Sequence, residues 1–331
     1  MASRTVRGWA ANAVAMGLLA LAGSGCALAP QRVRGPVPSR EVALGRALGW
    51  LKEHPASLDD GGLLELGEEA ILYGVLHSVA NSEAERARWR GRIGKVLAAV
   101  RRRGTPAPST PGEATTCIGM AWAADLAGLD AADLRELVEN GLLHNPLAYP
   151  PKPTTVLLNG VLLRDLGYCP AIAPEDAWPR GVIATMAADP SLNPARMGYP
   201  STLGLFTFFY DVTHEVLALA DMGRADPRRR LSPRELEMAR RLLAEGVDLC
   251  LRTRDVDLVG ELMICAEYLR WPGLPRVQEA WDLVLSSQRP EGHFGRMQRL
   301  RVMPGRNPYR HSVLVAAWAL AVCERPGGQK P

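Results

Sequence analysis

Residues 203–222 read LGLFTFFYDVTHEVLALADM, a run in which nearly every side of a helix would be apolar. The apolar side chains recur three and four residues apart, which predicts a helix rather than a strand. A helix that is apolar all round is expected to be enclosed by other elements. We therefore expect residues 203–222 to form an inner helix that neighbouring helices cover.

The other apolar runs from Ser39 onward have the same helical spacing, and alternating strand patterns are absent. Helices are predicted over residues 40–54, 63–80, 83–102, 113–126, 131–143, 154–166, 180–187, 203–222, 233–252, 257–269, 276–287 and 310–323. Residues 83–102 and 233–252 carry many Arg and Glu beside an apolar stripe, as outer helices with one solvated face do. This alternation predicts an all-α fold arranged as an α/α toroid of inner and outer helices. A helical-repeat solenoid is the alternative, although no repeat of fixed period is present.

Residues 283–295, LVLSSQRPEGHFG, resemble the Gln/Gly/aromatic repeat at hairpin turns of terpene cyclases and protein prenyltransferase β-subunits, both α/α toroids. In the prenyltransferase β-subunits, a helix resembling residues 258–268 supplies an acid and a cysteine to zinc, and a later helix supplies a histidine. By this resemblance Glu261 and His311 occupy comparable places. Met263 stands where the family has the cysteine, and the acid-rich motifs of terpene cyclases are absent. The resemblance therefore implies a fold and not an activity.

The N-terminal sequence has the layout of a secretory signal. Arg4 and Arg7 precede an uncharged stretch, residues 8–31, whose centre is rich in Ala and Leu. Within it, residues 22–26 read AGSGC and resemble the lipobox of bacterial lipoproteins, in which the cysteine is acylated and becomes the mature N-terminus. Cys26 is then the lipidation site, a position that carries acyl chains such as palmitate. Gly departs from the Leu that the family usually has at the second of these five positions.

These features predict four segments: a signal peptide over residues 1–25, a lipidated cysteine and tether over 26–38, a single helical domain over 39–325, and a tail over 326–331. The protein would be anchored in the bacterial cell envelope, in the outer membrane facing the periplasm. Two alternatives remain open. Cleavage after Ala22 would release a soluble exported protein, and an uncut segment would be long enough to span a membrane.

Charge and motif content exclude several classes of protein. The formal charge is +4, from 39 Lys plus Arg against 35 Asp plus Glu, and falls to about +2 when two arginines leave with the signal peptide. Such a small positive charge argues against a nucleic-acid partner. Phosphate-loop, dinucleotide-binding and nucleophile-elbow motifs are absent. The six cysteines include no CxxC pair, so a disulfide scaffold is not expected.

Three predicted helices each place an ionisable group within an apolar stripe. Asp211 and His214 align at helical spacing in residues 203–222, and Glu261 lies in the apolar stripe of its own helix. His311 lies near the start of the last helix. Buried charges are tolerated chiefly when they meet partners or a metal. We therefore predict that His214, Glu261 and His311 converge, with Asp211 close to His214.

Such a set can supply a general acid and base, or bind Zn²⁺ through nitrogen and oxygen. A satisfied polar network between inner helices is the structural alternative. In residues 63–80, a partly exposed polar stripe accounts for Glu69, Tyr73 and His77. Two functions follow from these patterns. The first is a lipid-anchored enzyme that acts on a small molecule, glycan or peptide in a central cavity, and the second is a non-catalytic envelope lipoprotein that binds a partner or acts as a scaffold.

Overall fold

The computed structural model describes residues 37–56, 62–102, 104, 107–295 and 307–323, which all belong to one compact unit. Within these ranges the chain is all-α, with thirteen α-helices and no strand, as the helical spacing predicts. The expected signal peptide, Cys26 and the C-terminal tail lie outside the described residues. No helix in the described part of the chain is long and apolar enough to cross a membrane.

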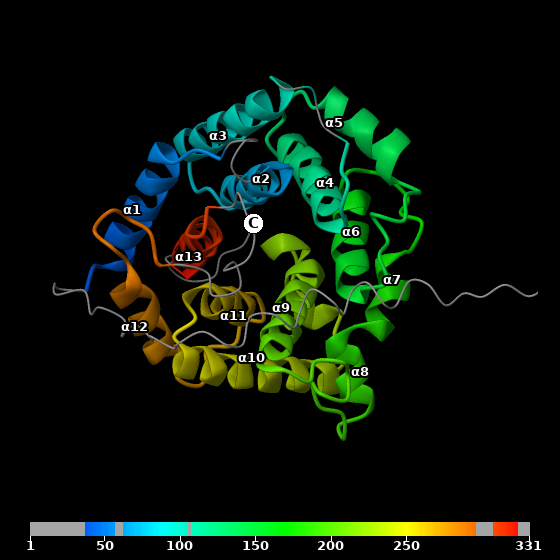
Figure 1. Cartoon of the computed structure of the whole chain (residues 1–331), viewed down its shortest axis with the longest axis vertical. Coiled ribbons are helices and arrows are strands. Elements are labelled where there is room, and N and C mark those ends of the chain that lie inside the picture. The colour runs from blue at the N-terminus through cyan, green and yellow to red at the C-terminus, as the bar shows by residue number, and fades with distance from the viewer. Residues whose placement is uncertain (1–36, 57–61, 103, 105–106, 296–306, 324–331) are drawn as a thin grey trace, which may run out of the picture. The chain divides into compact units, whose positions relative to one another are not determined.

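Six helices contact one another in a closed order (Figure 1). These are α2 (Gly62–Ser78), α4 (Pro111–Leu126), α6 (Pro153–Asp165), α9 (Thr202–Leu219), α11 (Val256–Tyr268) and α13 (Arg310–Cys323). Each packs against the next, and α13 packs against α2. The remaining helices lie outside them: α1 (Arg40–Glu53), α3 (Glu83–Arg101), α5 (Ala132–Leu137), α7 (Pro174–Ala177), α8 (Val182–Ala188), α10 (Pro233–Thr253) and α12 (Val277–Ser287).

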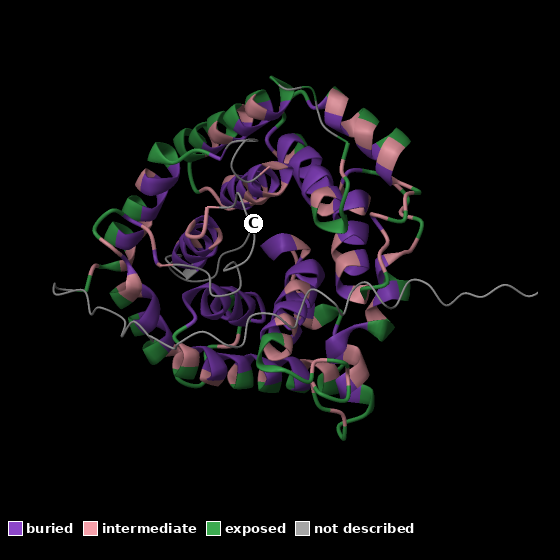
Figure 2. Ribbon diagram, in the orientation of Figure 1, coloured by how far each residue is buried: buried purple, intermediate pink, exposed green. Residues whose placement is uncertain are grey.

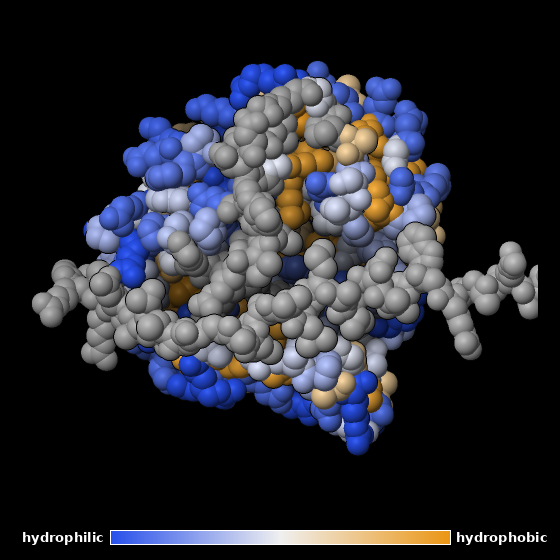
Figure 3. Space-filling view, viewed as in Figure 1, coloured by the Kyte–Doolittle hydropathy of each residue, from blue (hydrophilic) through white to orange (hydrophobic). Residues whose placement is uncertain are grey.

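The two sets of helices differ in burial, as their sequences predict. The six inner helices are buried over most of their surface, whereas the outer helices alternate buried and exposed residues (Figure 2). On the face shown in Figure 3, hydrophilic residues lie along the rim and hydrophobic residues lie nearer the middle. Inner helices α2 and α4 approach closely because α2 carries glycine at the contact. A Cβ atom at Gly67 would lie 2.1 Å from the Cβ of Thr116.

Side-chain caps fix several helix starts. Ser39, Ser82 and Ser232 each accept a hydrogen bond from a backbone N–H in the first turn of the helix that follows. Apart from shifts of helix ends, such as the end of α9 at Leu219 rather than at residue 222, the structure departs from the predicted α-helices at two places. The predicted helix over residues 131–143 ends early and continues as a π-helical turn, Val138–Leu142, and the four-residue helix α7 was not predicted. A single turn is too short to show a helical period, which explains why the sequence pattern misses α7.

A buried arginine joins the two ends of this closed order. Arg310, the first residue of α13, is 2% exposed and pairs with the carboxylate of Glu69 on α2. Its Nε lies 3.9 Å from the carboxylate of Glu65, also on α2, and its guanidinium donates to the backbone carbonyl of His54 after α1. The backbone N–H of Asn307 donates to Glu65 as well, at 2.9 Å. The last helix is therefore held to the first two by one charged side chain.

Replacing Arg310 by Met should lower the free energy of unfolding by about 3–5 kcal/mol, because two buried carboxylates would lose their cation. Denaturant unfolding followed by circular dichroism measures this loss. The matched control is Arg101→Met, which removes an exposed pair with Asp133 at 2.6 Å and should cost at most about 1 kcal/mol. Equal losses in the two variants would contradict the role assigned to Arg310.

Candidate functional site

Helices α11 and α13 bring a carboxylate and an imidazole together. Nδ1 of His311 lies 2.7 Å from Oδ1 of Asp257, and the hydroxyl of Tyr210 on α9 donates to the other oxygen of that carboxylate. Asp255 caps the start of α11 by accepting from the backbone N–H of Leu258 at 2.9 Å. The cap places Asp257 in the first turn of α11, where it faces the first turn of α13.

A second pair of the same kind lies one helical turn further along α11. Nε2 of His214 on α9 lies 3.7 Å from Oε2 of Glu261. The same oxygen accepts a hydrogen bond of 2.5 Å from the hydroxyl of Thr213. The side chain of Glu261 is only 5% exposed and that of His214 is 39% exposed, so the carboxylate is buried and the imidazole reaches solvent.

The two pairs adjoin. Asp257, Glu261 and His311 each offer a nitrogen or oxygen atom, and these three atoms lie within 4.8 Å of one another. The structure therefore brings together His214, Glu261 and His311 from helices α9, α11 and α13, which are neighbours in Figure 1. We call these four side chains, Asp257 included, the histidine–carboxylate centre. Asp257 is a member that the sequence analysis did not select.

The charges of the first pair stabilise each other. Burial by itself would lower the pKa of His311, but the adjacent Asp257 carboxylate raises it from 6.5 to about 10. Glu68 on α2 and Glu261 contribute in the same direction. Burial by itself would raise the pKa of Asp257, but the His311 imidazolium lowers it. At neutral pH the pair is an imidazolium and a carboxylate.

Asp211, which the sequence places beside His214, makes its described contacts elsewhere. Its carboxylate lies 2.5 Å from Nζ of Lys152 and accepts a hydrogen bond of 2.7 Å from the hydroxyl of Tyr199. The neighbouring Glu215 is fully buried and accepts the backbone N–H groups of Val182 and Ile183 at the start of α8, at 2.6 and 3.0 Å. Burial raises the pKa of Glu215 to about 7. Asp211 and Glu215 thus attach α9 to its surroundings.

Polar residues of α2 also differ from the sequence prediction. Glu69 and Tyr73 are buried rather than partly exposed, and the Tyr73 hydroxyl donates to Glu69 at 2.7 Å. Glu69 in turn pairs with Arg310, so this stripe faces the inside of the domain. The signal available in the sequence was the helical spacing of Glu65 and Glu69 within a largely apolar helix.

The fold and the site define an all-α protein with paired histidines and carboxylates among its inner helices. The chain belongs to the family described as a domain of unknown function (DUF6895), whose model matches residues 44–321. Comparisons with curated proteins and with solved structures gave no match. The family match spans every described helix except the first few residues of α1 and the end of α13.

The pKa of His311 can be measured by NMR titration of its imidazole. We expect a pKa near 10 in the wild type. In Asp257→Asn the pKa should fall by about one unit or more, because the carboxylate that offsets the effect of burial is then gone. The protonated pair adds stability fully below pH 6.5, and this contribution is lost as the pH rises through about 10.

Asp248→Asn, which removes an exposed carboxylate on α10 that pairs with Arg276, is the control and should leave the His311 titration unchanged. A wild-type pKa near the ordinary histidine value would contradict the assigned ion pair.

Proposed function

We propose that this chain is an enzyme whose catalytic residues are His214, Glu261, His311 and Asp257, and that its closed order of helices is an α/α toroid. The observation that carries the proposal is the adjacency of two histidine–carboxylate pairs on inner helices. In each pair the carboxylate is buried and the imidazole is more exposed, at 39% for His214 and 19% for His311. An ion pair that only stabilises the fold does not require a partly exposed imidazole, and here two such pairs lie side by side.

The two pairs suit different steps of an acid–base reaction. In the His214–Glu261 pair, the carboxylate lies beside the imidazole, so His214 can accept a proton from water or substrate while Glu261 stabilises the cation formed. In the Asp257–His311 pair, His311 already carries a proton because Asp257 stabilises it, so it can stabilise negative charge that develops on the substrate. The substrate would be a small molecule, glycan or peptide, and hydrolysis is the reaction that this pairing favours.

A second candidate is a metal-dependent reaction. Asp257, Glu261 and His311 supply two oxygens and one nitrogen close enough to share a divalent cation such as Zn²⁺. The set differs from the predicted His214, Glu261 and His311 because Asp257 takes the place of His214. A bound Zn²⁺ would activate water, and His214 beside Glu261 could accept the proton. The proton that His311 carries would compete with a metal for its imidazole, which is why acid–base chemistry is the first candidate.

The proposal is tested by assaying the purified full chain on p-nitrophenyl esters, p-nitrophenyl glycosides and aminoacyl p-nitroanilides. His214→Ala should lower kcat on the active class by about 10²–10⁴-fold while changing the melting temperature little, because the side chain is partly exposed. His77→Ala replaces a half-buried histidine on α2 and should leave kcat unchanged.

Absence of turnover on all three classes, or equal kcat in the wild type and His214→Ala, would contradict the enzyme proposal. Native mass spectrometry decides between the two candidates. A bound divalent ion that is lost, together with activity, in Asp257→Asn would establish the metal-dependent reaction. Activity that persists after dialysis against EDTA would establish metal-free acid–base chemistry.

We also propose that the protein is exported and anchored by a lipid on Cys26, in the bacterial envelope and facing the periplasm. The support is the sequence alone: an uncharged stretch that follows two arginines and ends at a lipobox-like cysteine. Its partners would then be the membrane, through the lipid, and either a small molecule or an envelope protein.

Replacing Cys26 by Ser should abolish incorporation of labelled palmitate and reduce partitioning into the detergent phase, because buried acyl chains provide the membrane affinity. Cys169→Ser, at the one exposed cysteine among those the structure describes, should change neither result. Equal label in Cys26→Ser and the wild type, or no label in either, would contradict lipidation at this residue.

A further inference from the structure

A pocket of about 320 Å³ lies between α6, α7 and the end of α9. Its lining includes none of the four residues of the histidine–carboxylate centre. The pocket has an apolar wall and a charged end, which is the composition of a site for a small ligand with one polar group.

The apolar wall is formed by firmly packed side chains. Leu157 and Val161 on α6 are 2% and 1% exposed, and Leu219 at the end of α9 is 5% exposed. The indole of Trp178 completes the wall, and its Nε1 donates to Glu235 at 2.9 Å, which fixes the ring. Since these side chains are already ordered, an apolar ligand would bind without ordering the wall.

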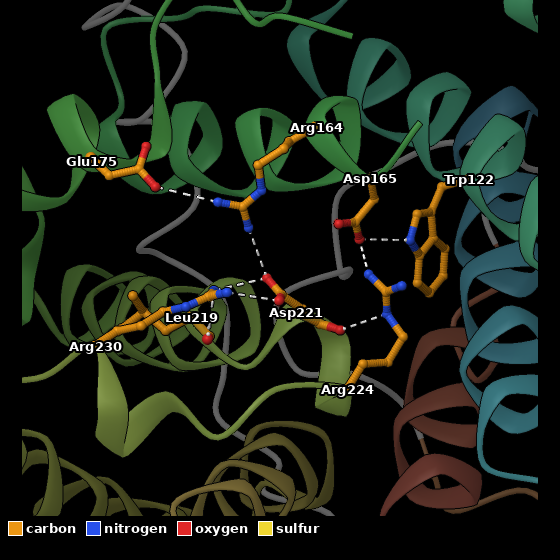
Figure 4. Close-up of polar contacts among 8 residues, drawn as sticks. All are labelled: Trp122, Arg164, Asp165, Glu175, Leu219, Asp221, Arg224 and Arg230. Carbon is orange, nitrogen blue, oxygen red and sulfur yellow. Dashed lines mark hydrogen bonds and ion pairs between the residues drawn. The ribbon is translucent and has the colours of Figure 1, made fainter. Parts of the chain in front are cut away.

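The charged end is formed by Arg164 and Arg230, which converge on Asp221 (Figure 4). Arg230 contacts both carboxylate oxygens of Asp221 at 2.8 Å and also donates to the carbonyl of Leu219 at 2.9 Å. Arg164 reaches Asp221 at 3.1 Å. These contacts hold both guanidinium groups at the pocket, and Asp221 is only 14% exposed, so it is a fixed part of the site.

Two guanidinium groups and one carboxylate leave an excess of one positive charge at this end. Glu175 balances it through a single contact of 3.3 Å to Arg164. The Glu175 side chain is 74% exposed, whereas both arginines are about half as exposed. An exposed ion pair of this kind is weak, so an incoming carboxylate can take the place of Glu175 at Arg164.

We propose that this pocket binds a small monocarboxylate with an apolar body, such as a medium-chain fatty acid. The ligand carboxylate replaces that of Glu175 at Arg164, and the chain lies against Leu157, Val161 and Trp178. The charge of the ligand restores neutrality at the arginines, and its chain removes apolar surface from water. The site is independent of the proposed catalytic residues and would bind its ligand whether or not the chain is an enzyme.

Isothermal titration calorimetry of the purified full chain tests the proposal with three probes. Octanoate has both the charge and the chain, octanamide has the chain without the charge, and acetate has the charge without the chain. Octanoate should bind at least about tenfold more tightly than either of the others. Equal affinity for octanoate and octanamide, or for octanoate and acetate, would overturn the proposal, as would no binding of octanoate.

Variants locate the binding at this pocket. Glu175→Gln removes the competing carboxylate and should tighten octanoate binding by about two- to fivefold, whereas Asp176→Asn, at the exposed acid beside it, should have no effect. Arg164→Gln should weaken binding by about tenfold or more. Since Glu175 is largely exposed, its variant is expected to fold, and identical affinities in Glu175→Gln and Asp176→Asn would place octanoate elsewhere and refute the site.

Discussion

The fold depends on the burial of one arginine between helices from opposite ends of the chain. Each helix can be specified by its own residues, but contact between α13 and α2 joins segments that are 241 residues apart. Arg310 makes this contact specific because a guanidinium that is 2% exposed is tolerated only where carboxylates surround it. Gln288, which follows α12, donates to the carbonyl of Ala43 in α1 at 2.8 Å, so a second buried polar side chain joins the late part of the chain to its first described helix.

The closure and the candidate site share the first turn of α13. Arg310 and His311 are consecutive residues, and consecutive side chains on a helix point about 100° apart. Arg310 therefore reaches Glu65 and Glu69 on α2 while His311 reaches Asp257 on α11. Holding the arginine fixes the rotation of α13, which in turn fixes the direction of the histidine. The same turn thus stabilises the fold and positions the candidate site.

The sequence predicts the all-α class because helix period is a local property, and α9 shows it through apolar residues on every side. It also selects His214, Glu261 and His311, since each interrupts an apolar stripe. It does not select Asp257, which resembles an ordinary helix-start residue until α13 is known to pack beside it. For the same reason the sequence places Asp211 beside His214. In the structure the carboxylate of Asp211 instead contacts Lys152 and Tyr199, which come from other parts of the chain. Which carboxylate pairs with which base depends on contacts between helices, and the local sequence pattern does not report these contacts.

Among the described residues, several acids gather around the histidine–carboxylate centre. Glu65, Glu68 and Glu69 on α2 and Asp257 and Glu261 on α11 lie around Arg310 and His311. The contacts of Arg310 with Glu65 and of His311 with Asp257 show that the first turns of α2, α11 and α13 meet here. The N-terminal end of a helix carries a partial positive charge, so these three ends stabilise the carboxylates gathered here. The same three helix starts therefore bring together the buried acids, the arginine that joins α13 to α2 and the histidine of the candidate site.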